Sequence, residues 1–180
     1  YTKRAAGIEG TKADFSEIEK NQIRAADKDA AVLMQQKIEE YHRQGNSCGG
    51  IVECIVKGLP AGLGEPVFDK MDAELAHAIV SIGAVKGIEF GLGFEAADSN
   101  AGGILGGMTN GNDLVFRAAV KPVPSIYQKE ETIDINGNEC DILIEGRHDV
   151  CLCPRIVPVI EAMTAITVAD MILRNRSSRI

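Results

Sequence analysis

The segment from about Pro154 to Arg176 constrains the fold more than any other, because it predicts a long helix with apolar residues on most sides. Two prolines, Pro154 and Pro158, stand near its start, where the first turn of a helix tolerates proline. The apolar positions, which spread over more than half of the circumference, are Ile156, Val159, Ile160, Met163, Ile166, Val168 and Ile172. Such a helix should be buried on most sides, for example between two sheets.

The composition is that of an ordinary globular protein rather than a disordered chain. The chain has 180 residues, of which 45% are hydrophobic and 25% are charged. It contains no obvious linker or low-complexity segment, so residues 1–180 are expected to form a single domain with a sizeable core. The formal net charge of −7 argues against non-specific binding to nucleic acid or to an anionic membrane.

Cysteine usage predicts a reducing compartment. The five cysteines include no CxxC pair, and the sequence shows neither a signal peptide nor an apolar run of membrane-spanning length. A cytoplasmic location is therefore expected. The spacing of His148, Cys151 and Cys153 matches no standard zinc pattern, so no metal site is predicted, and buried or half-buried free thiols are favoured instead.

Apolar periodicity predicts two further helices and several strands. The first helix covers about 27–44, with Asp27 placed to cap it, and the second covers about 68–82. Residues 51–57 and 87–94 have the composition of strands. Asn110-Gly111 predicts a hairpin turn with 114–120 as the returning strand, and a second hairpin pairs 132–135 with 142–144.

Two glycine-containing segments are candidates for contact with a flat ligand. Four glycines between Gly102 and Gly107 would weaken a strand, which indicates that a ligand or another backbone lies close. Gly83 and Ala84 follow the second predicted helix, and their small side chains would let a ligand lie against the backbone. A tight helix-to-strand turn explains Gly83 and Ala84 equally well.

Two polar segments are candidates for anion binding. Lys121-Pro122-Val123-Pro124-Ser125 places a lysine and a hydroxyl four residues apart on a turn stiffened by prolines, which suits a phosphate. Arg147 and Asp149 lie on the loop that leads into the last helix, at its electropositive end. The alternative for that loop is a surface Arg–Asp pair, which contributes little.

Five motifs, in this order, resemble chorismate synthase, and the resemblance covers nearly the whole chain. They are GNSCGG at 45–50, GLGEPVFD at 62–69, NAGGILGG at 100–107, KPVPS at 121–125 and GRHD at 146–149. The match is to the C-terminal half of the family's chain. It implies an α+β fold, a β-α-β sandwich with antiparallel sheets packed on buried helices, and a homotetramer.

The resemblance also implies an activity. Members of this family are carbon–oxygen lyases that convert 5-enolpyruvylshikimate 3-phosphate to chorismate by 1,4-elimination of phosphate. The reaction belongs to the shikimate pathway of aromatic amino acid biosynthesis and requires reduced FMN, although it causes no net redox change.

The motifs carry implied roles to particular residues. The implied cofactor-binding residues are Gly83, Ala84, Gly106, Lys121, Pro122, Val123, Pro124, Ser125 and Arg147. Among them, Lys121 and Ser125 should hold the FMN phosphate side, and Arg147 should also reach the substrate. Asp149 is the implied catalytic residue, near flavin N5, where a carboxylate can move a proton. For His148, a structural role is expected.

Two departures from the family qualify these implications. The family's N-terminal half, with its two catalytic histidines and most substrate-binding arginines, is absent from these 180 residues. The family also has a longer segment where only Asp98 and Ser99 stand here. The alternative function is therefore a flavin- or phosphate-binding half-domain without activity of its own. A purely structural oligomerisation domain would leave the glycine-rich segment and the Lys121–Ser125 turn without a purpose.

Overall fold

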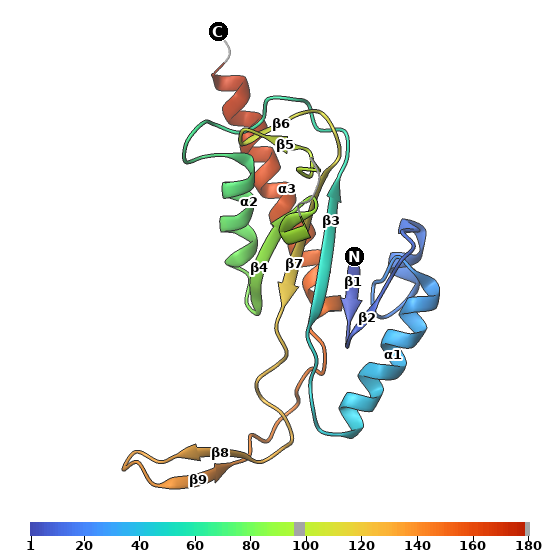
Figure 1. Cartoon of the computed structure of the whole chain (residues 1–180), viewed down its shortest axis with the longest axis vertical. Helices are drawn as coiled ribbons and strands as arrows, with labels where there is room; N and C mark the ends of the chain where they lie inside the picture. Colours follow the sequence, from blue (N-terminus) through green and yellow to red (C-terminus); the bar gives the residue numbers. More distant parts are fainter. Residues whose placement is uncertain (96–99, 179–180) are drawn as a thin grey trace.

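The computed structural model describes residues 1–95 and 100–178, and its centre is a five-stranded antiparallel sheet (Figure 1). The strands stand in the order β2-β1-β3-β7-β4. Their bounds are Thr2–Ala5 for β1, Ile8–Glu9 for β2, Gly50–Val56 for β3, Val85–Phe90 for β4 and Leu114–Val120 for β7. The predicted strands at 51–57 and 114–120 are thus confirmed within a residue, whereas the predicted strand at 87–94 begins and ends earlier.

The two faces of the sheet differ, as expected for an antiparallel sheet covered on one side. Leu114, Phe116 and Ala118 of β7 are fully buried, while the residues between them are partly exposed. On the open face, Arg117 stands opposite a glutamate on each neighbouring strand. Its guanidinium pairs with Glu89 at 2.9 Å, so this cross-strand row joins β7 to β4.

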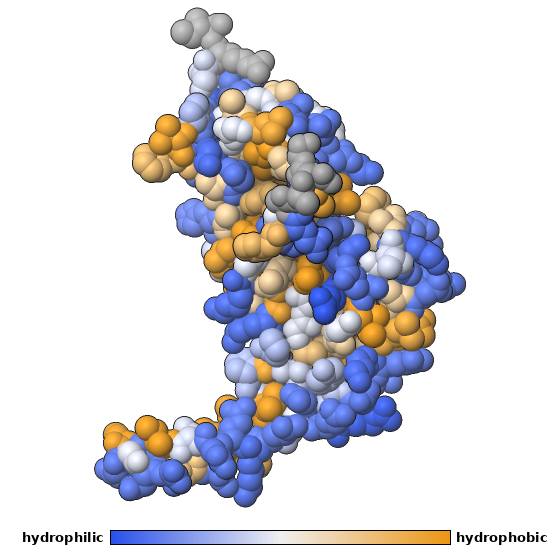
Figure 2. Space-filling view, in the orientation of Figure 1, coloured by the Kyte–Doolittle hydropathy of each residue, from blue (hydrophilic) through white to orange (hydrophobic). Residues whose placement is uncertain are grey.

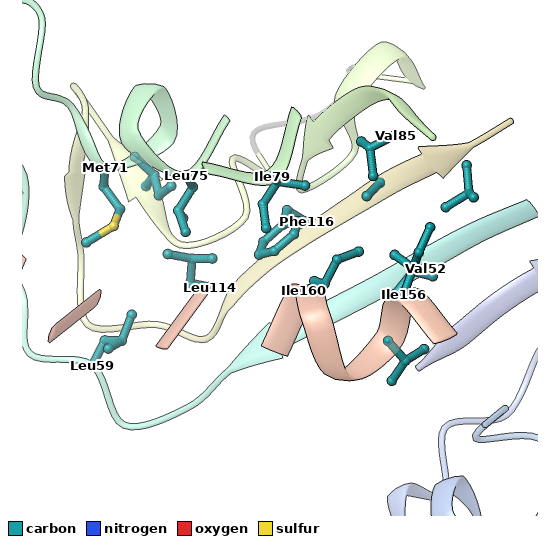
Figure 3. Packing of buried hydrophobic residues seen from close by; sticks show 14 of the residues in the cluster. Val52, Leu59, Met71, Leu75, Ile79, Val85, Leu114, Phe116, Ile156 and Ile160 are labelled. Atoms are coloured by element: carbon teal, nitrogen blue, oxygen red, sulfur yellow. The ribbon is translucent and has the colours of Figure 1, made fainter. Parts of the chain in front are cut away.

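Helices α2 (Met71–Val80) and α3 (Cys153–Ser177) pack against each other on the covered face. Figure 3 shows Ile79 of α2 and Ile160 of α3 approaching Phe116 of the sheet. The second helix begins at Met71 rather than at about 68. Phe68, predicted on its apolar face, lies in the preceding loop and is 84% exposed. The correct apolar positions are Met71, Leu75 and Ile79, which are all fully buried.

Helix α3 has the predicted bounds but not the predicted burial. Ile156, Ile160 and Met171 are buried, whereas Ile166 and Leu173 are 64% and 63% exposed. The expectation of burial on most sides is wrong for the described residues, because a single sheet packs on this helix there. By length and composition α3 could also cross a membrane, so the expectation that no apolar run of that length exists is wrong too. On the side that packs on the sheet, α3 contributes Ile156, Ile160 and Met171 to the hydrophobic core.

Helix α1 (Lys28–Arg43) lies beside β1 and β2, away from the other two helices (Figure 1). The predicted cap is confirmed, because the Asp27 carboxylate accepts from the backbone N–H groups of Asp29 and Ala30. Hydrogen bonds from backbone N–H groups, above all that of Ala30, lower the pKa of Asp27 to about 2. Met34 fills a second small core with Ala5 and Ile23, near the short 3₁₀ helix Phe15–Lys20.

Two hairpins complete the fold. Strands β8 (Glu130–Ile133) and β9 (Glu139–Ile142) form an exposed arm that projects from the body, with apolar residues near its tip (Figures 1 and 2). This predicted hairpin is confirmed, although its two strands begin two and three residues before the predicted 132–135 and 142–144. The other predicted turn, Asn110-Gly111, is wrong as a hairpin turn: the Asn110 side chain accepts the N–H of Asn112, and β7 then pairs with β3 and β4.

The tight hairpin in the glycine-rich segment is instead β5 (Ile104–Leu105) with β6 (Met108–Thr109). Gly106 and Gly107 form its turn with φ values of 61° and 87°, the left-handed conformation that such a two-residue turn requires at both positions. Strand β4 ends at Phe90 because Gly91 turns the chain away with φ at 57°, before a 3₁₀ turn at Gly93–Glu95. The α+β class with antiparallel sheets is confirmed, while the segment at Asp98 and Ser99 lies outside the described residues.

Candidate functional site

The five motifs gather at opposite ends of the sheet. We call the end where β3 begins and β7 finishes the Lys121 end, and the end where β3 finishes and β7 begins the Thr109 end. Six residue steps along β7, at about 3.4 Å each, separate the two ends by roughly 20 Å. The motifs at 45–50, 121–125 and 146–149 lie at the Lys121 end, and those at 62–69 and 100–107 lie at the Thr109 end.

At the Lys121 end, the loop before β3 packs on the turn after β7. The buried Ser47 hydroxyl donates to the carbonyl oxygen of Val123 at 2.7 Å, and the N–H of Tyr127 donates to the carbonyl oxygen of Gly45 at 2.9 Å. A Cβ atom on Gly49 would lie 2.5 Å from the carbonyl oxygen of Val120. Glycine is therefore required at position 49 for the two segments to come this close.

The GRHD loop joins the same assembly. The N–H of Cys48 donates to the carbonyl oxygen of Val150 at 2.8 Å, and Cys48 and Cys151 form a parallel bridge. The His148 ring stands edge-on to the Tyr127 ring at 5.2 Å, and its Nε2 lies 3.1 Å from the carbonyl oxygen of Ile144. These contacts are those expected of a structural histidine.

The three loops enclose a small hollow that brings Ser125 and Asp149 together. Its lining also includes Ser47, Tyr127 and His148. The volume of the hollow is about 10 Å³, which is room for at most one water molecule and far below the roughly 300–1,000 Å³ typical of small-molecule sites. The described residues therefore do not by themselves form a flavin site in this hollow.

The second half of the Lys121 end is the turn at Gly83 and Ala84. The N–H of Lys121 donates to the carbonyl oxygen of Ala84 at 2.9 Å, so two segments singled out from the sequence are in direct contact. Ala84 has φ at 71°, a left-handed conformation that costs an ordinary residue about 1–2 kcal/mol. Gly83 is exposed, and no atom lies within 4 Å of the position a Cβ would take. Backbone strain beside open space is a pattern found at ligand sites.

Asp149 is held by a residue that sequence reasoning did not select. Its carboxylate pairs with Arg155 at 2.9 Å, not with Arg147, which is exposed. The Arg155 side chain is 74% exposed, so the pair stabilises the fold by at most about 1 kcal/mol. Nor does Asp149 cap α3, because the helix begins after Leu152 without a side-chain cap. Asp149 is thus not explained as a helix cap.

Gly106 lies at the Thr109 end, away from the other candidate residues. There the Thr109 hydroxyl donates to the carbonyl oxygen of Pro60 and accepts the N–H of Leu63, and the N–H of Met71 donates to the carbonyl oxygen of Gly107. These bonds join the motifs at 62–69 and 100–107. Gly106 itself is exposed at the tip of the hairpin, with open space around it.

Sequence reasoning missed Ser47, Tyr127 and Arg155 as part of this site. From the sequence, the glycine-rich approach to β3 stands out only as one of the five family motifs. Its contact with the Lys121–Ser125 turn depends on the pairing of Gly50 with Val120, which local composition does not reveal.

Comparison with known proteins identifies the family. A family model described as chorismate synthase matches residues 3–173. The chorismate synthase of Maridesulfovibrio salexigens is 47% identical over 98% of this chain and 55% of its own length. The chorismate synthase of Methanosarcina mazei is 47% identical over 94% of this chain and 53% of its own length.

A solved structure agrees with these relatives. A crystal structure of chorismate synthase superposes with a TM-score of 0.73 and 28% identity, over 91% of this chain and 48% of the other. The chain spans about half the length of the curated relatives it matches. The family match, which extends over almost all of the sequence, shows that the chain belongs to the chorismate synthase family.

Proposed function

We propose that the complete protein is a chorismate synthase, a carbon–oxygen lyase that eliminates phosphate from 5-enolpyruvylshikimate 3-phosphate with reduced FMN. The observation that carries the proposal is the contact of Ala84 with Lys121 beside the loop assembly that joins Ser125 and Asp149. Residues 1–180 would act as one domain of a cytoplasmic homotetramer in aromatic amino acid biosynthesis, with no nucleic acid or membrane partner.

The residues of the Lys121 end fit one side of a flavin nucleotide. Lys121 supplies a cation and Ser125 a hydroxyl for the phosphate group, on a turn held rigid by Pro122 and Pro124 with Val123 between them. Gly83 offers open space against which a flat ring can lie, and Ala84 fixes the turn that presents it. Bound reduced FMN would lend an electron to the substrate transiently and regain it, so that the elimination proceeds without net redox change.

The chain's own residues would then position anions and move a proton. Arg147, exposed at the start of the GRHD loop, can offset the charge of the cofactor or of the leaving phosphate. Asp149 can accept a proton within the site, because its carboxylate keeps one oxygen outside the ion pair with Arg155. Roughly 10²–10⁴ in rate is the usual contribution of such a group.

Gly106 lies at the end of the sheet opposite Lys121, so its contact with the flavin needs a separate explanation. Because the Thr109 end lies roughly 20 Å from Lys121, either an elongated FMN reaches along the sheet or Gly106 contacts the flavin bound by another copy in the tetramer. Gly106→Asn is the suitable variant, since asparagine tolerates the left-handed conformation of this turn, which valine does not. Tetramers can be assembled from wild-type subunits and Gly106→Asn subunits. If FMN then binds more weakly to the Lys121 ends of the wild-type subunits, Gly106 contacts the flavin of a neighbouring copy.

Turnover of the complete protein tests the function. Chorismate and phosphate should form in equal amounts from 5-enolpyruvylshikimate 3-phosphate when reduced FMN is present, and neither should form with oxidised FMN alone. Failure to form chorismate under anaerobic conditions would overturn the proposal.

The alternative is a flavin- or phosphate-binding half-domain without activity. The observation that favours it is the small hollow at Asp149, which has no room for a flavin or a substrate in these 180 residues. The 180-residue chain and the complete protein should be compared for FMN binding by fluorescence and for turnover. Binding with no turnover by either protein would establish the alternative.

A further inference from the structure

Three cysteines from two distant segments meet where α3 begins. Cys48 comes from the loop before β3, Cys151 lies two residues before α3, and Cys153 is the first residue of the helix. Cys48 and Cys151 form a parallel bridge, and a Cβ atom on Gly50 would lie 2.7 Å from the Cys153 sulfur. Glycine at position 50 thus leaves room for that thiol. All three cysteines are free.

Of the three cysteines, Cys151 is the most exposed. Cys48 is 5% exposed and Cys153 is fully buried, whereas Cys151 is only half-buried and opens to a surface pocket. The charged residues that line this pocket are Glu19, Lys20, Arg24 and Arg155. Among the residues that line this pocket, cations therefore outnumber carboxylates by three to one. Each cation also has a carboxylate partner: Arg24 pairs with Glu19 at 3.5 Å, Lys20 with Glu17 and Arg155 with Asp149.

The proline in α3 helps to hold this pocket. Pro158 has no N–H to donate to the carbonyl oxygen of Pro154, and the Arg24 guanidinium donates to that oxygen at 3.0 Å instead. Arg24 is in this way fixed beside Cys151. The N-terminus of α3 adds its own positive potential, which favours an anion at the residue before the helix.

The hydrogen bonds within the cluster favour the thiolate at Cys151. Bonds from the thiols of Cys153 and Cys48 lower the pKa of the Cys151 thiol. The same bonds, with burial, raise the pKa of Cys48 and of Cys153. The nucleophilic form is thus concentrated on the most exposed of the three cysteines, which lines a surface pocket.

We propose that Cys151 is a modification site for peroxides and small soft electrophiles, with Cys48 as the thiol that closes a disulfide onto it. Hydrogen peroxide would form an S–O bond to the Cys151 thiolate as its O–O bond breaks, so that sulfur is oxidised to sulfenic acid and the released hydroxide leaves as water after protonation. The Cys48 sulfur would then form the S–S bond as the S–O bond breaks. Its proton leaves with the hydroxyl group as a second water.

The backbone geometry favours Cys48 over Cys153 as the resolving thiol. Neighbouring strands lie about 4.8 Å apart, and disulfides require Cα atoms at about 4.4–6.8 Å. Cys153 is held in the first turn of α3 and is fully buried. A Cys48–Cys151 disulfide would tie the loop at 45–50 to the GRHD loop. Any effect of this disulfide on flavin binding rests on the proposed function. The formation of the disulfide does not depend on the proposed function.

Alkylation rates test the nucleophile without any substitution. The reduced complete protein is treated with limiting iodoacetamide at about pH 6.5, where an ordinary thiol is about 1% ionised, and each cysteine is quantified by peptide mass spectrometry. Cys151 should react about tenfold faster than the exposed Cys140, since its greater ionisation outweighs the lower nucleophilicity of a stabilised thiolate. A Cys151 that reacts more slowly than Cys140 would overturn the proposal.

Peroxide treatment tests the disulfide. Mapping without reduction should yield a Cys48–Cys151 cross-linked peptide in the wild type and in the control Cys140→Ser. Cys48→Ser should instead accumulate a sulfenic acid that dimedone traps at Cys151. A cross-link between Cys151 and Cys153, or no oxidation at Cys151, would contradict the assignment. Should Cys48→Ser fail to fold, the wild-type cross-link map decides alone.

Discussion

At the Thr109 end of the sheet, Gly64 and Gly107 are enclosed by the chain's own atoms, whereas at the Lys121 end Gly83 faces open space. A Cβ on Gly64 would lie 2.4 Å from the carbonyl oxygen of Gly107, and one on Gly107 would meet the Lys70 side chain at the same distance. Gly83 has nothing within 4 Å, and the strained Ala84 follows it.

The difference shows that a glycine motif has two physical meanings. At the Thr109 end glycine lets two stretches of backbone cross, and the hydrogen bonds of Thr109 complete the crossing. At the Gly83 turn, glycine leaves a surface uncovered beside a lysine and a strained residue, which is what a ligand requires. A glycine-rich sequence is compatible with either role, a close approach of two backbone segments or an open surface for a ligand.

The largest expected effect concerns catalysis at the Lys121 end. Asp149→Asn keeps the shape and one acceptor oxygen but removes the charge and the basicity. Turnover of the complete protein should fall by about 10²–10⁴, while melting temperature and FMN affinity stay nearly unchanged, because the Arg155 side chain of the ion pair is largely exposed. Steady-state assays with reduced FMN measure the change.

Arg155→Gln is the matched control for Asp149→Asn, because it breaks the same ion pair from the other side. If turnover of Arg155→Gln stays within a few-fold of wild type, the fall in turnover of Asp149→Asn is due to loss of the carboxylate itself and not to loss of the ion pair. An equal loss in both variants would mean that Asp149 serves to position the loop.

The next effect is structural and belongs to the Thr109 end. Gly64→Ala should destabilise the protein by about 2–4 kcal/mol, since Gly64 has φ at 118° and the added Cβ meets the Gly107 carbonyl oxygen. Gly62→Ala is the control, with φ at 89° but no atom within 4 Å. It should cost less, about 1 kcal/mol. Denaturant titrations that give equal losses for the two variants would remove the close contact as a cause.

A smaller effect is expected for the cofactor. Lys121→Ala should weaken FMN binding by about 10- to 150-fold, the equivalent of one charge-assisted contact to a phosphate. The backbone bond from Lys121 to Ala84 is unaffected by the change, so the turn should persist. Fluorescence titration provides the measurement, with Lys86→Ala as a control for net charge. Equal affinity in the two variants would exclude Lys121 from the phosphate site.

Local sequence patterns predicted the elements whose causes are local. The Asp27 cap, the helix at 28–43 and the arm hairpin follow from neighbouring residues, and all three are confirmed. The hairpin at Asn110-Gly111 failed because Gly106-Gly107 supplies a competing turn, and Leu114 continues into a strand already flanked by β3 and β4. The burial of α3 was overestimated because apolarity alone does not reveal what covers a helix within the described chain.

The residues of the candidate site likewise fall into those that local sequence predicts and those that depend on contacts between distant segments. The lysine, serine and prolines at 121–125 could be chosen by their chemistry, and so could Arg147 and Asp149. Ser47 and Arg155 could not, because their roles depend on the Gly50–Val120 register and on the start of α3. The Cys48–Cys151 bridge is non-local for the same reason, so the sequence showed free thiols without showing that they meet.

The smallest effect, and the one that most sharpens the comparison, comes from Ala84→Gly. Glycine relieves the left-handed strain at φ 71° but adds freedom to the unfolded chain, so the net gain should be about 0.5–1 kcal/mol, or roughly 1–4 °C in melting temperature. If the strain exists to hold a flavin-facing turn, the same variant should weaken FMN binding a few-fold, because a glycine turn holds its shape less well. Ala6→Gly, which relieves strain at φ 49° outside the candidate cofactor residues, should leave FMN affinity unchanged. A stabilised Ala84→Gly variant with unaltered FMN affinity would show that Gly83 and Ala84 form only a tight turn between α2 and β4, and both ends of the sheet would then use their unusual backbone for folding alone.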